Sequence, residues 1–374
     1  MATLPPGATI GILGGGQLGR MMAIAAARYG LQVHIFTPES NAPAADVSKD
    51  STRADYEDTQ ALLRFAAACD VVTYEFENIP RASLEALAGA VPLRPGIASL
   101  ETSQDRLVEK QFLENLGLHV APYRAINSAA DIVQAHQELG KDTILKTCRF
   151  GYDGKGQARL KPDTDIDQQK LWQSVGAQPS VLEARIPFIA ELSAVISRGQ
   201  HGQCVAYDVP VNTHKDGILD TSAIGSFAST SISETLAQQA QDAAMRVANA
   251  LDHVGVLTVE FFLTDSNELL VNEFAPRVHN SGHWTMDACL NDQFDNHIRA
   301  VAGMPLGSAA RHSDALMTNL IADDVEMAHD WSEKKDVQLH LYAKGEARKG
   351  RKMGHVTQIA PIRTQSHQKL SAKT

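Results

Sequence analysis

Cysteine and long apolar runs are scarce in this sequence. The four cysteines, Cys69, Cys148, Cys204 and Cys289, lie far apart and form no CxxC pair. A structural zinc site or a disulfide framework is therefore not expected, and a reducing compartment fits. The longest apolar runs are far below the roughly 20 residues that a membrane span needs, and no basic stretch followed by an apolar core marks a signal peptide. We expect a soluble cytoplasmic protein that makes no use of a membrane.

Positive charge is also scarce. The chain has 34 Lys and Arg against 44 Asp and Glu, a formal net charge of −10. This argues against nucleic acid as a general partner, because neutralising phosphates requires clustered basic residues. The rest of the composition, 44% hydrophobic and 21% charged residues, is that of a folded protein. At 374 residues the chain is too long for one ordinary core, so we expect two or three domains.

Short apolar strands alternate with helices over the first hundred residues. Strands are expected at residues 9–13, 33–36 and 71–74, with helices at 18–29 and 59–69. This βαβαβ order predicts a parallel sheet covered by helices, with right-handed crossovers.

The middle of the chain has a different pattern. Thr102 or Ser103 is expected to cap a helix that runs to Leu116. From residue 143 to about 274, strands alternate polar and apolar residues, which predicts an antiparallel, α+β part. A polar tail from about Arg363 is expected to fray.

Gly14, Gly16 and Gly19 form a GxGxxG pattern between a strand and a helix. Such a loop lets the backbone approach an anion at the helix amino terminus. Three interpretations remain open, namely a tight turn alone, a dinucleotide site, or a site for another phosphate or small polar ligand. A dinucleotide site requires an acid after the second strand, where Glu39 is a displaced candidate.

Polar residues also follow the third strand. Glu75 and Asn78 lie at its carboxyl end and, with Gln17, could orient a small polar molecule in the crevice at that sheet edge. The alternative is that Glu75 and Asn78 only cap the helix that follows Pro80.

A second glycine loop spans residues 151–157 (GYDGKGQ). Its amides could wrap polyphosphate oxygens while Lys155 supplies charge, although a flexible hairpin is the plain alternative. The spacing is not that of a Walker A loop. Just before it, Lys146 lies in an apolar strand, an unusual place for a lysine unless it meets an anion. Downstream, Glu183 and Glu191 could accept hydrogen bonds from ribose hydroxyls or be solvated.

Two glutamates are expected on neighbouring strands of a hairpin that turns at residues 264–267. If Leu263 pairs with Glu268, Glu260 lies opposite Val271 and Glu273 is its diagonal neighbour on the same face, with Cβ atoms within about 7–8 Å. Mg²⁺ prefers such carboxylate oxygens. Two surface glutamates by coincidence remain the alternative.

Basic residues follow at two places. Arg277 and His279 come directly after the acidic strand, where Arg277 could neutralise a developing phosphate charge and His279 could transfer a proton. Near the carboxyl end stands a basic cluster whose glycine neighbours suggest a loop around an anion, a solvated face being the alternative: Lys344, Arg348, Lys349, Arg351 and Lys352.

Taken together, these segments resemble the ATP-grasp superfamily and, within it, the family of N5-carboxyaminoimidazole ribonucleotide synthetases. The resemblance covers nearly the whole chain, in order: residues 14–21 (GGGQLGRM), 75–78 (EFEN), 103–106 (SQDR), 151–157, 272–273 (NE), 279–285 (HNSGHWT) and 351–355 (RKMGH). It implies a three-domain ATP-grasp fold, α/β and α+β. The parts would be a Rossmann-like parallel-sheet domain (1–101), an ATP-grasp domain of two subdomains (102–300) and a carboxyl-terminal domain that completes the substrate site (301–374).

The resemblance also implies a reaction, in which ATP phosphorylates bicarbonate to carboxyphosphate, and this carboxylates the amine of 5-aminoimidazole ribonucleotide in purine biosynthesis. Glu260 and Glu273 would hold Mg²⁺, and Arg277, His279 and Lys352 would be catalytic. A homodimer is implied as well. The implied ATP contacts are Arg106, Lys146, Gly151, Tyr152, Asp153, Gly154, Lys155, Gly156, Gln157, Glu183, Ala184, Arg185, Ile186, Glu191, His214, Asn272 and Glu273. The implied ribonucleotide contacts are Gln17, Leu18, Glu75, Asn78, Tyr152, Asn280, Ser281, Lys344, Arg348 and Arg351.

The sequence departs from the family pattern at a few positions. Val278 replaces a usual proline, Val211 stands where an acid is common, and Arg149 and Phe150 replace a commoner pairing before the loop. The Val211 difference puts the contacts around His214 in doubt. Other classes stay open: a nicotinamide-dependent dehydrogenase, a formate-activating or biotin carboxylase-like ATP-grasp enzyme, and a non-enzymatic nucleotide sensor.

Overall fold

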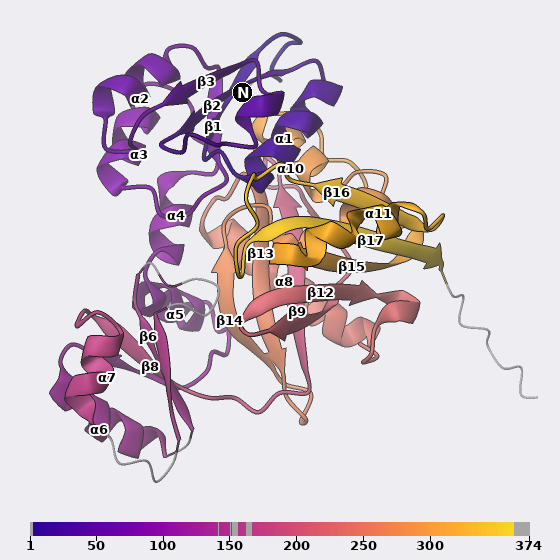
Figure 1. Ribbon diagram of the computed structural model, residues 1–374. Helices are drawn as coiled ribbons and strands as arrows, with labels where there is room; N and C mark the ends of the chain where they lie inside the picture. The colour runs from indigo at the N-terminus through magenta and orange to yellow at the C-terminus, as the bar shows by residue number, and fades with distance from the viewer. Residues whose placement is uncertain (1–2, 141, 150, 152–155, 162–166, 363–374) are drawn as a thin grey trace, which may run out of the picture.

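The computed structural model describes residues 3–140, 142–149, 151, 156–161 and 167–362. Its amino-terminal part is a parallel sheet of order β3-β2-β1-β4, at the top left in Figure 1. The strands are β1 (Thr9–Leu13), β2 (Gln32–Thr37), β3 (Asp50–Arg53) and β4 (Val71–Tyr74). The helices and the short 3-10 turn of this part are α1 (Gln17–Arg28), η1 (Ala45–Val47), α2 (Thr59–Ala66), α3 (Arg81–Ala88) and α4 (Ile97–Ser103). The predicted parallel sheet is confirmed, with β3 as an additional edge strand.

A small antiparallel sheet forms a lobe of its own, at the lower left in Figure 1. Its strand order is β5-β8-β6-β7, and helices α6 and α7 pack together beside it. The elements are β5 (Tyr123–Ile126), α6 (Ala129–Leu139), β6 (Thr143–Thr147), β7 (Gln157–Leu160), α7 (Gln168–Ser174) and β8 (Ser180–Ala184). A compact apolar cluster that includes Ile126, Leu145 and Leu182 holds the lobe together.

The described residues from β9 onward form one nine-stranded sheet of order β14-β13-β9-β11-β12-β15-β17-β16, with β10 paired to β9. The carboxyl-terminal strands therefore extend this sheet through the β12–β15 pairing. Its strands are β9 (Ala190–Arg198), β10 (Cys204–Ala206), β11 (Val211–Lys215), β12 (Ile218–Ile224), β13 (Gly255–Leu263), β14 (Leu269–Ala275), β15 (Ser313–Ile321), β16 (Val337–Leu341) and β17 (Lys352–Pro361). Its helices and 3-10 turns are η2 (Gly225–Phe227), α8 (Glu234–Ala250), η3 (Asn280–Gly282), α9 (Thr285–Ala288), α10 (Gln293–Val301), η4 (Ala322–Met327) and α11 (Ala328–Ser332).

Helix α5 (Arg106–Asn115) connects the amino-terminal part to the small lobe, and its start differs from the prediction. A cap at Thr102 or Ser103 is wrong, because those residues end α4. Asp105 is the cap instead, since its Oδ1 accepts hydrogen bonds from the N–H groups of Leu107 (3.1 Å) and Val108 (3.4 Å). An aspartate can satisfy two free amides at once at a helix start.

The register of the acidic hairpin also differs from the prediction. Leu263 pairs with Leu269, not Glu268, and a bulge follows between Phe261 and Glu260. The extra residue on β14 shifts the pairing so that Glu260 lies directly opposite Glu273. The predicted partner, Val271, pairs with Phe261. The two carboxylates are thus closer neighbours than the diagonal arrangement predicted.

Several features of the whole chain follow from this fold. All four cysteines are free. Within the described ranges, no helix combines the length and the apolar character of a membrane span. The predicted tail from Arg363 lies outside the described residues, and the domain boundaries at residues 101 and 300 stay a prediction.

Candidate active site

The amino-terminal glycine loop is occupied by a side chain of the protein itself. Glu75, directly after β4, accepts hydrogen bonds from the N–H groups of Gly16 (2.5 Å) and Gly19 (2.7 Å) through its two oxygens. A Cβ at Gly14 would meet the Glu75 side chain at 2.3 Å, so glycine is required there. Burial raises the pKa of Glu75, and the two amides oppose that shift. Because this carboxylate fills the place of a phosphate, the loop does not offer a dinucleotide site.

The contacts also decide whether Glu75 and Asn78 cap the helix that follows Pro80. Helix α3 starts after Pro80 without any side-chain cap, so Glu75 and Asn78 do not cap it. Instead Glu77, which we had not singled out, forms an ion pair with Arg277. Arg277 also donates to the carbonyl oxygen of Val278 at 2.9 Å. The end of β4 is therefore joined to the turn after β14.

Unpartnered polar atoms gather where the end of β4 meets the turn after β14. Tyr74 Oη, Arg277 Nε and Asn280 Oδ1 are buried and have no hydrogen-bond partner among the residues that the structure describes. Buried polar atoms are nearly always satisfied in native proteins. We therefore expect a polar ligand or water to bind here and to supply the missing hydrogen bonds.

Each member of the acidic pair has a nitrogen partner on a basic side chain. His279 Nε2 lies 3.0 Å from Glu260 Oε1, and Arg106 Nη1 donates to Glu273 Oε2 at 2.8 Å. Burial works against the ionised form of Glu260, but His279, His214 and Lys352 outweigh it and lower its pKa to about 2. The two carboxylates face each other at a point where positive charge already gathers.

The ring of His279 has a defined orientation. Its Nδ1 lies 2.8 Å from Ser281 Oγ and accepts a hydrogen bond from the Ser281 N–H at 3.3 Å. Since an amide can only donate, the proton of the neutral ring stands on Nε2, toward Glu260. Buried Gln293 brackets the same turn, accepting from His279 N (2.9 Å) and donating to His279 O (2.7 Å).

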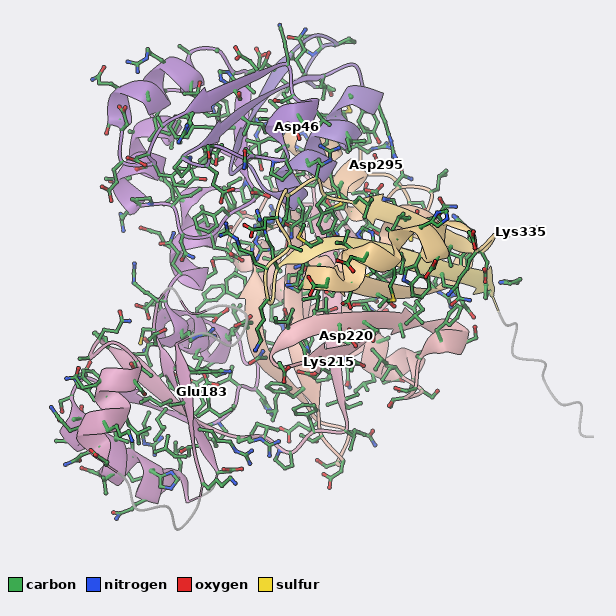
Figure 2. All side chains as sticks on the ribbon, viewed as in Figure 1. Asp46, Glu183, Lys215, Asp220, Asp295 and Lys335 are labelled. Atoms are coloured by element: carbon green, nitrogen blue, oxygen red, sulfur yellow. The ribbon has the colours of Figure 1, made fainter. Side chains whose placement is uncertain are left out.

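The lysine in β6 meets an anion, as expected, but an internal one. Lys146 Nζ donates to Glu183 Oε2 at 2.9 Å, and Lys110 Nζ lies 3.3 Å from Glu183 Oε1. Figure 2 labels Glu183, which projects from β8 of the small lobe. Burial opposes its ionisation, yet Lys146 and Lys110 lower the pKa of Glu183 to about 2. Glu183 therefore holds two cations in place.

Val211 lies in a regular part of the strand pairing, and the ATP contacts around His214 stay a prediction. Val211 pairs with Leu192 and Asn212 with Glu191. After a bulge in β11, His214 Nδ1 lies 2.9 Å from Glu191 Oε2. Burial lowers the pKa of His214, but the bond to Glu191 outweighs it, so the net shift is upward. At the other departure, Val278 packs fully buried in the core.

The basic cluster lines a hollow of about 380 Å³ between the amino-terminal and carboxyl-terminal parts. Lys344, Arg348, Arg351 and Glu346 line it from the carboxyl-terminal part, and Glu39, Ser40 and Asn41 line it from the amino-terminal part. Burial lowers the pKa of Lys344 to about 8, and Glu75 opposes the shift. Three basic side chains that line one hollow can bind an anion, although Glu39 and Glu346 line it as well. Lys352 is buried at the start of β17, near Glu260.

The remaining predicted residues are placed as follows. Gln17 and Leu18 open α1, and Asn272 is the extra residue of the β14 bulge. Ala184, Arg185 and Ile186 lie where β8 leads to β9. Of the second glycine loop, Gly151, Gly156 and Gln157 are described, whereas Phe150, Tyr152, Asp153, Gly154 and Lys155 lie outside the described residues. A Cβ at Gly156 would meet Thr147 Oγ1 at 2.8 Å.

Glu109 and Lys110 were missed by sequence reasoning. Glu109 is buried on α5 and accepts a hydrogen bond from the Phe274 N–H at 2.7 Å. Burial, followed by the charge of Glu273, raises its pKa to about 8. The available signal was their spacing, because residues three and four positions after Arg106 share its helix face.

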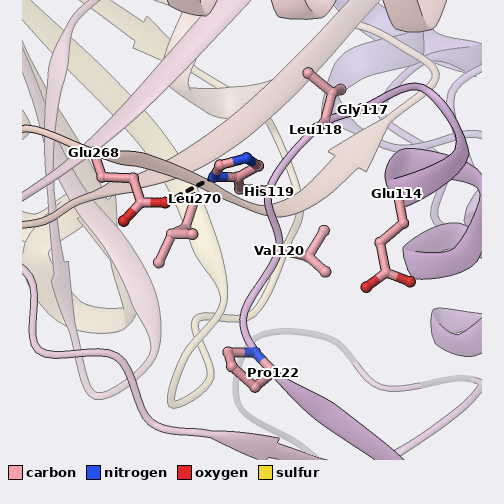
Figure 3. Close-up of a pocket in the computed structure, with 8 residues that line it drawn as sticks. All are labelled: Glu114, Gly117, Leu118, His119, Val120, Pro122, Glu268 and Leu270. Carbon is pink, nitrogen blue, oxygen red and sulfur yellow. Dashed lines mark hydrogen bonds and ion pairs between the residues drawn. The ribbon is translucent and has the colours of Figure 1, made fainter.

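Two other features lie apart from the predicted site residues. A wider hollow of about 560 Å³ surrounds the chain between α5 and β5, where His119 and Glu268 form a hydrogen bond of 2.7 Å (Figure 3). Asp287, His340 and His355 bring ligand atoms within 4.8 Å of one another. His340 Nε2 already lies 3.0 Å from Asp287 Oδ2, however, and His355 Nδ1 lies 2.7 Å from Tyr342 Oη.

Comparison with known proteins covers the chain in three segments. A sequence model of the ribonucleotide synthetase preATP-grasp domain matches residues 7–104, one of the ATP-grasp domain matches 111–294, and one of the phosphoribosylaminoimidazole carboxylase C-terminal domain matches 315–369. The N5-carboxyaminoimidazole ribonucleotide synthase of Brucella melitensis is 48% identical over 96% of this chain and 98% of its own. That of Bacillus subtilis is 40% identical over 94% and 91%.

Solved structures agree in fold. A Staphylococcus aureus N5-carboxyaminoimidazole synthetase complexed with ADP has a TM-score of 0.90 at 35% identity, covering 96% of this chain and 95% of the other. An Aspergillus clavatus N5-carboxyaminoimidazole synthase in complex with ADP and 5-aminoimidazole ribonucleotide has a TM-score of 0.87 at 28% identity, with 96% and 95% covered. On this evidence the chain belongs to the N5-carboxyaminoimidazole ribonucleotide synthase family of ATP-grasp enzymes.

Proposed function

We propose that this chain is an ATP-dependent ligase that carboxylates 5-aminoimidazole ribonucleotide with bicarbonate, releasing ADP and phosphate. One observation carries the proposal: side chains from the amino-terminal part, helix α5 and the nine-stranded sheet meet along one line of contacts. Glu77 of the amino-terminal part pairs with Arg277, while Arg106 and His279 flank the Glu260–Glu273 pair. The family membership of the whole chain supports the same reaction.

ATP lies between the small lobe and the nine-stranded sheet in this proposal. Lys146 and Lys110, both held by Glu183, supply fixed positive charge on the side of the small lobe, and Arg106 supplies it next to Glu273. The family resemblance assigns the cover over the phosphates to residues 151–157, of which 152–155 lie outside the described residues. Carboxyphosphate hydrolyses readily, so the reaction requires such a cover to exclude water.

Glu260 and Glu273 are the proposed Mg²⁺ ligands. Their fit is good, because two carboxylates in direct register offer the hard oxygen donors that this ion prefers. Their present partners are N–H donors, the guanidinium of Arg106 and the ring of His279, which supports two ionised carboxylates that attract positive charge. When bound, Mg²⁺ supplies charge neutralisation on the phosphate oxygens during phosphoryl transfer.

Bicarbonate is a poor electrophile, so its oxygen first attacks the γ-phosphorus and ADP leaves. The amine of the ribonucleotide then attacks the carboxyl carbon, phosphate leaves and the amine loses a proton. Arg277 and buried Lys352 stabilise the charge that develops on the carboxyphosphate oxygens. His279, with its orientation fixed by Ser281 and Gln293, passes the proton from the amine to the departing phosphate.

The ribonucleotide occupies the seam from the end of β4 to the basic hollow. Its phosphate takes the place beside Lys344, Arg348 and Arg351. Gln17, Leu18, Glu75, Asn78, Tyr152, Asn280 and Ser281 position its ribose and base. The orphaned Asn280 Oδ1 is a ready acceptor for the amine. A homodimer and a cytoplasmic location remain predictions that accompany this proposal.

The decisive experiment measures ADP release by the purified chain with Mg-ATP and bicarbonate, with and without 5-aminoimidazole ribonucleotide. Strong stimulation by the ribonucleotide supports the proposal. Release that responds to formate or to another amine instead would keep the ATP-grasp assignment and refute this substrate. ATP binding without any turnover would identify a nucleotide sensor.

A further inference from the structure

The bulge in β14 decides where Glu273 points. Opposite β13 the strand advances by an extra residue, Asn272, between the Phe261–Val271 and Glu260–Glu273 pairs. Because side chains alternate between faces, a regular strand without this residue would put Glu273 out of register with Glu260. The facing of the two carboxylates therefore depends on keeping an irregular backbone.

The same bulge changes which amides point outward from the edge of the sheet. β14 is an edge strand, and Val271 N donates outward to His119 O at 2.7 Å. In a regular strand the next outward amides would belong to residues 273 and 275, since successive residues alternate. After the bulge it is Phe274 N that points outward, and it donates to Glu109 Oε1 at 2.7 Å.

The burial of Glu109 suits it to accept a hydrogen bond from the backbone of β14. It is 2% exposed on α5, so its carboxyl is withdrawn from water and its acceptor is directed to a backbone amide. Arg106, one turn earlier on the same helix, holds the Glu273 side chain at 2.8 Å. Helix α5 thus grips two consecutive residues of the bulged strand, one by its side chain and one by its backbone.

We propose that Glu109 is a positioning residue for the metal pair: by accepting the Phe274 N–H, it holds the bulge that sets Glu273 opposite Glu260. This rests on the proposed role of Glu260 and Glu273 as metal ligands. Glu109 acts through the backbone and touches neither metal nor substrate. Residues that orient metal ligands from behind typically change metal affinity by about 10- to 100-fold.

The test compares variants of residue 109 that separate the effects of the hydrogen-bond acceptor, the charge and the volume of the side chain. Glu109→Gln keeps an acceptor of the same reach, Glu109→Met keeps the volume without an acceptor, and Glu109→Asp keeps the carboxyl but withdraws it. Glu114→Met, an exposed site on the same helix, is the matched control. Binding of Mn²⁺ to the full chain with a non-hydrolysable ATP analogue is measured by electron paramagnetic resonance.

Glu109→Met and Glu109→Asp should raise the Mn²⁺ dissociation constant about tenfold, whereas Glu109→Gln and Glu114→Met stay within about twofold of the parent chain. The KM for the ribonucleotide should not change. Hydrogen exchange in residues 271–276 should accelerate only in the Met and Asp variants. Parent-like Mn²⁺ binding in either folded variant would overturn the inference.

Two further measurements keep the outcomes distinct. If the Met and Asp variants do not fold, exchange of the Phe274 amide in the parent chain decides, because a rate like that of an exposed amide contradicts the contact with Glu109. Glu273→Gln tests the underlying assignment. Unchanged Mn²⁺ binding there refutes the metal site itself, whereas loss there with parent-like binding in Glu109→Met refutes only the role of Glu109.

Discussion

A buried histidine at the junction of the amino-terminal sheet and the large sheet makes acid stability a sharp test of the packing. His297 on α10 is fully buried, with Nε2 2.8 Å from Thr73 Oγ1. Its Nδ1 accepts a hydrogen bond from Val256 N at 3.1 Å. An amide must donate, so Nδ1 carries no proton in the native state, and a second proton would break this bond.

The magnitude follows from the pKa. Burial, with a smaller contribution from the charge of His253, lowers the pKa of His297 to about 3 from the ordinary 6.5. Below pH 6.5 His297 is protonated in the unfolded chain but stays neutral in the native chain. The contribution of this ring to the free energy of unfolding is therefore fully present above pH 6.5 and is lost as the pH falls toward 3. Between pH 6.5 and about pH 5 this ring lowers the free energy of unfolding by about 2 kcal/mol, since each pH unit costs roughly 1.4 kcal/mol.

Urea unfolding at about pH 7.5 and about pH 5 measures this loss in the parent chain and in His297→Gln, a neutral replacement with a donor and an acceptor. Other groups titrate equally in both proteins, so their contributions cancel in the difference. The parent should lose about 2 kcal/mol more than the variant between the two pH values. Losses that agree within about 0.5 kcal/mol, the usual error of additivity, would refute the buried neutral state of this ring.

Three variants test the proposed chemistry. Glu273→Gln should reduce ribonucleotide-stimulated ADP release by about 100-fold or more with unchanged circular dichroism, because a metal ligand loses its charge; near-normal turnover at low Mg²⁺ would contradict the assignment. His279→Ala should reduce turnover about 100-fold while the KM for ATP stays within about threefold, and a collapse of ATP affinity would show that its role is different. Lys146→Met should raise the KM for ATP about tenfold or more, since a charge-assisted bond is worth roughly 1.5–3 kcal/mol, whereas an effect confined to the ribonucleotide would place Lys146 elsewhere.

Much of the architecture could be predicted from local pattern. The strand–glycine–helix unit at Gly14 and the pairing of strands that carry Glu260 and Glu273 follow from alternation and turn residues. Edge strand β3 was missed because its residues, DSTR, are mostly exposed and carry no apolar signal. The hairpin register was missed because a bulge adds a residue without changing composition.

The contacts between distant segments were harder to predict. That Glu77 meets Arg277, or that Lys110 joins Lys146 at Glu183, depends on how separate elements pack, which no spacing encodes. The resemblance to a family supplied most of the site residues, and it did so position by position. It did not reveal Glu109, whose contact is with a backbone amide.

The carboxylate of Glu75 in the amino-terminal glycine loop bears on selectivity among metabolites. Cells hold many phosphorylated compounds that compete for any open cradle of backbone amides. Here the Gly16 and Gly19 amides already bind the carboxylate of Glu75. Because Glu75 belongs to the same chain, its effective concentration at these amides exceeds that of a free metabolite. A dinucleotide or nucleotide phosphate therefore finds the Gly16 and Gly19 amides already bonded, and would have to displace Glu75 to bind them.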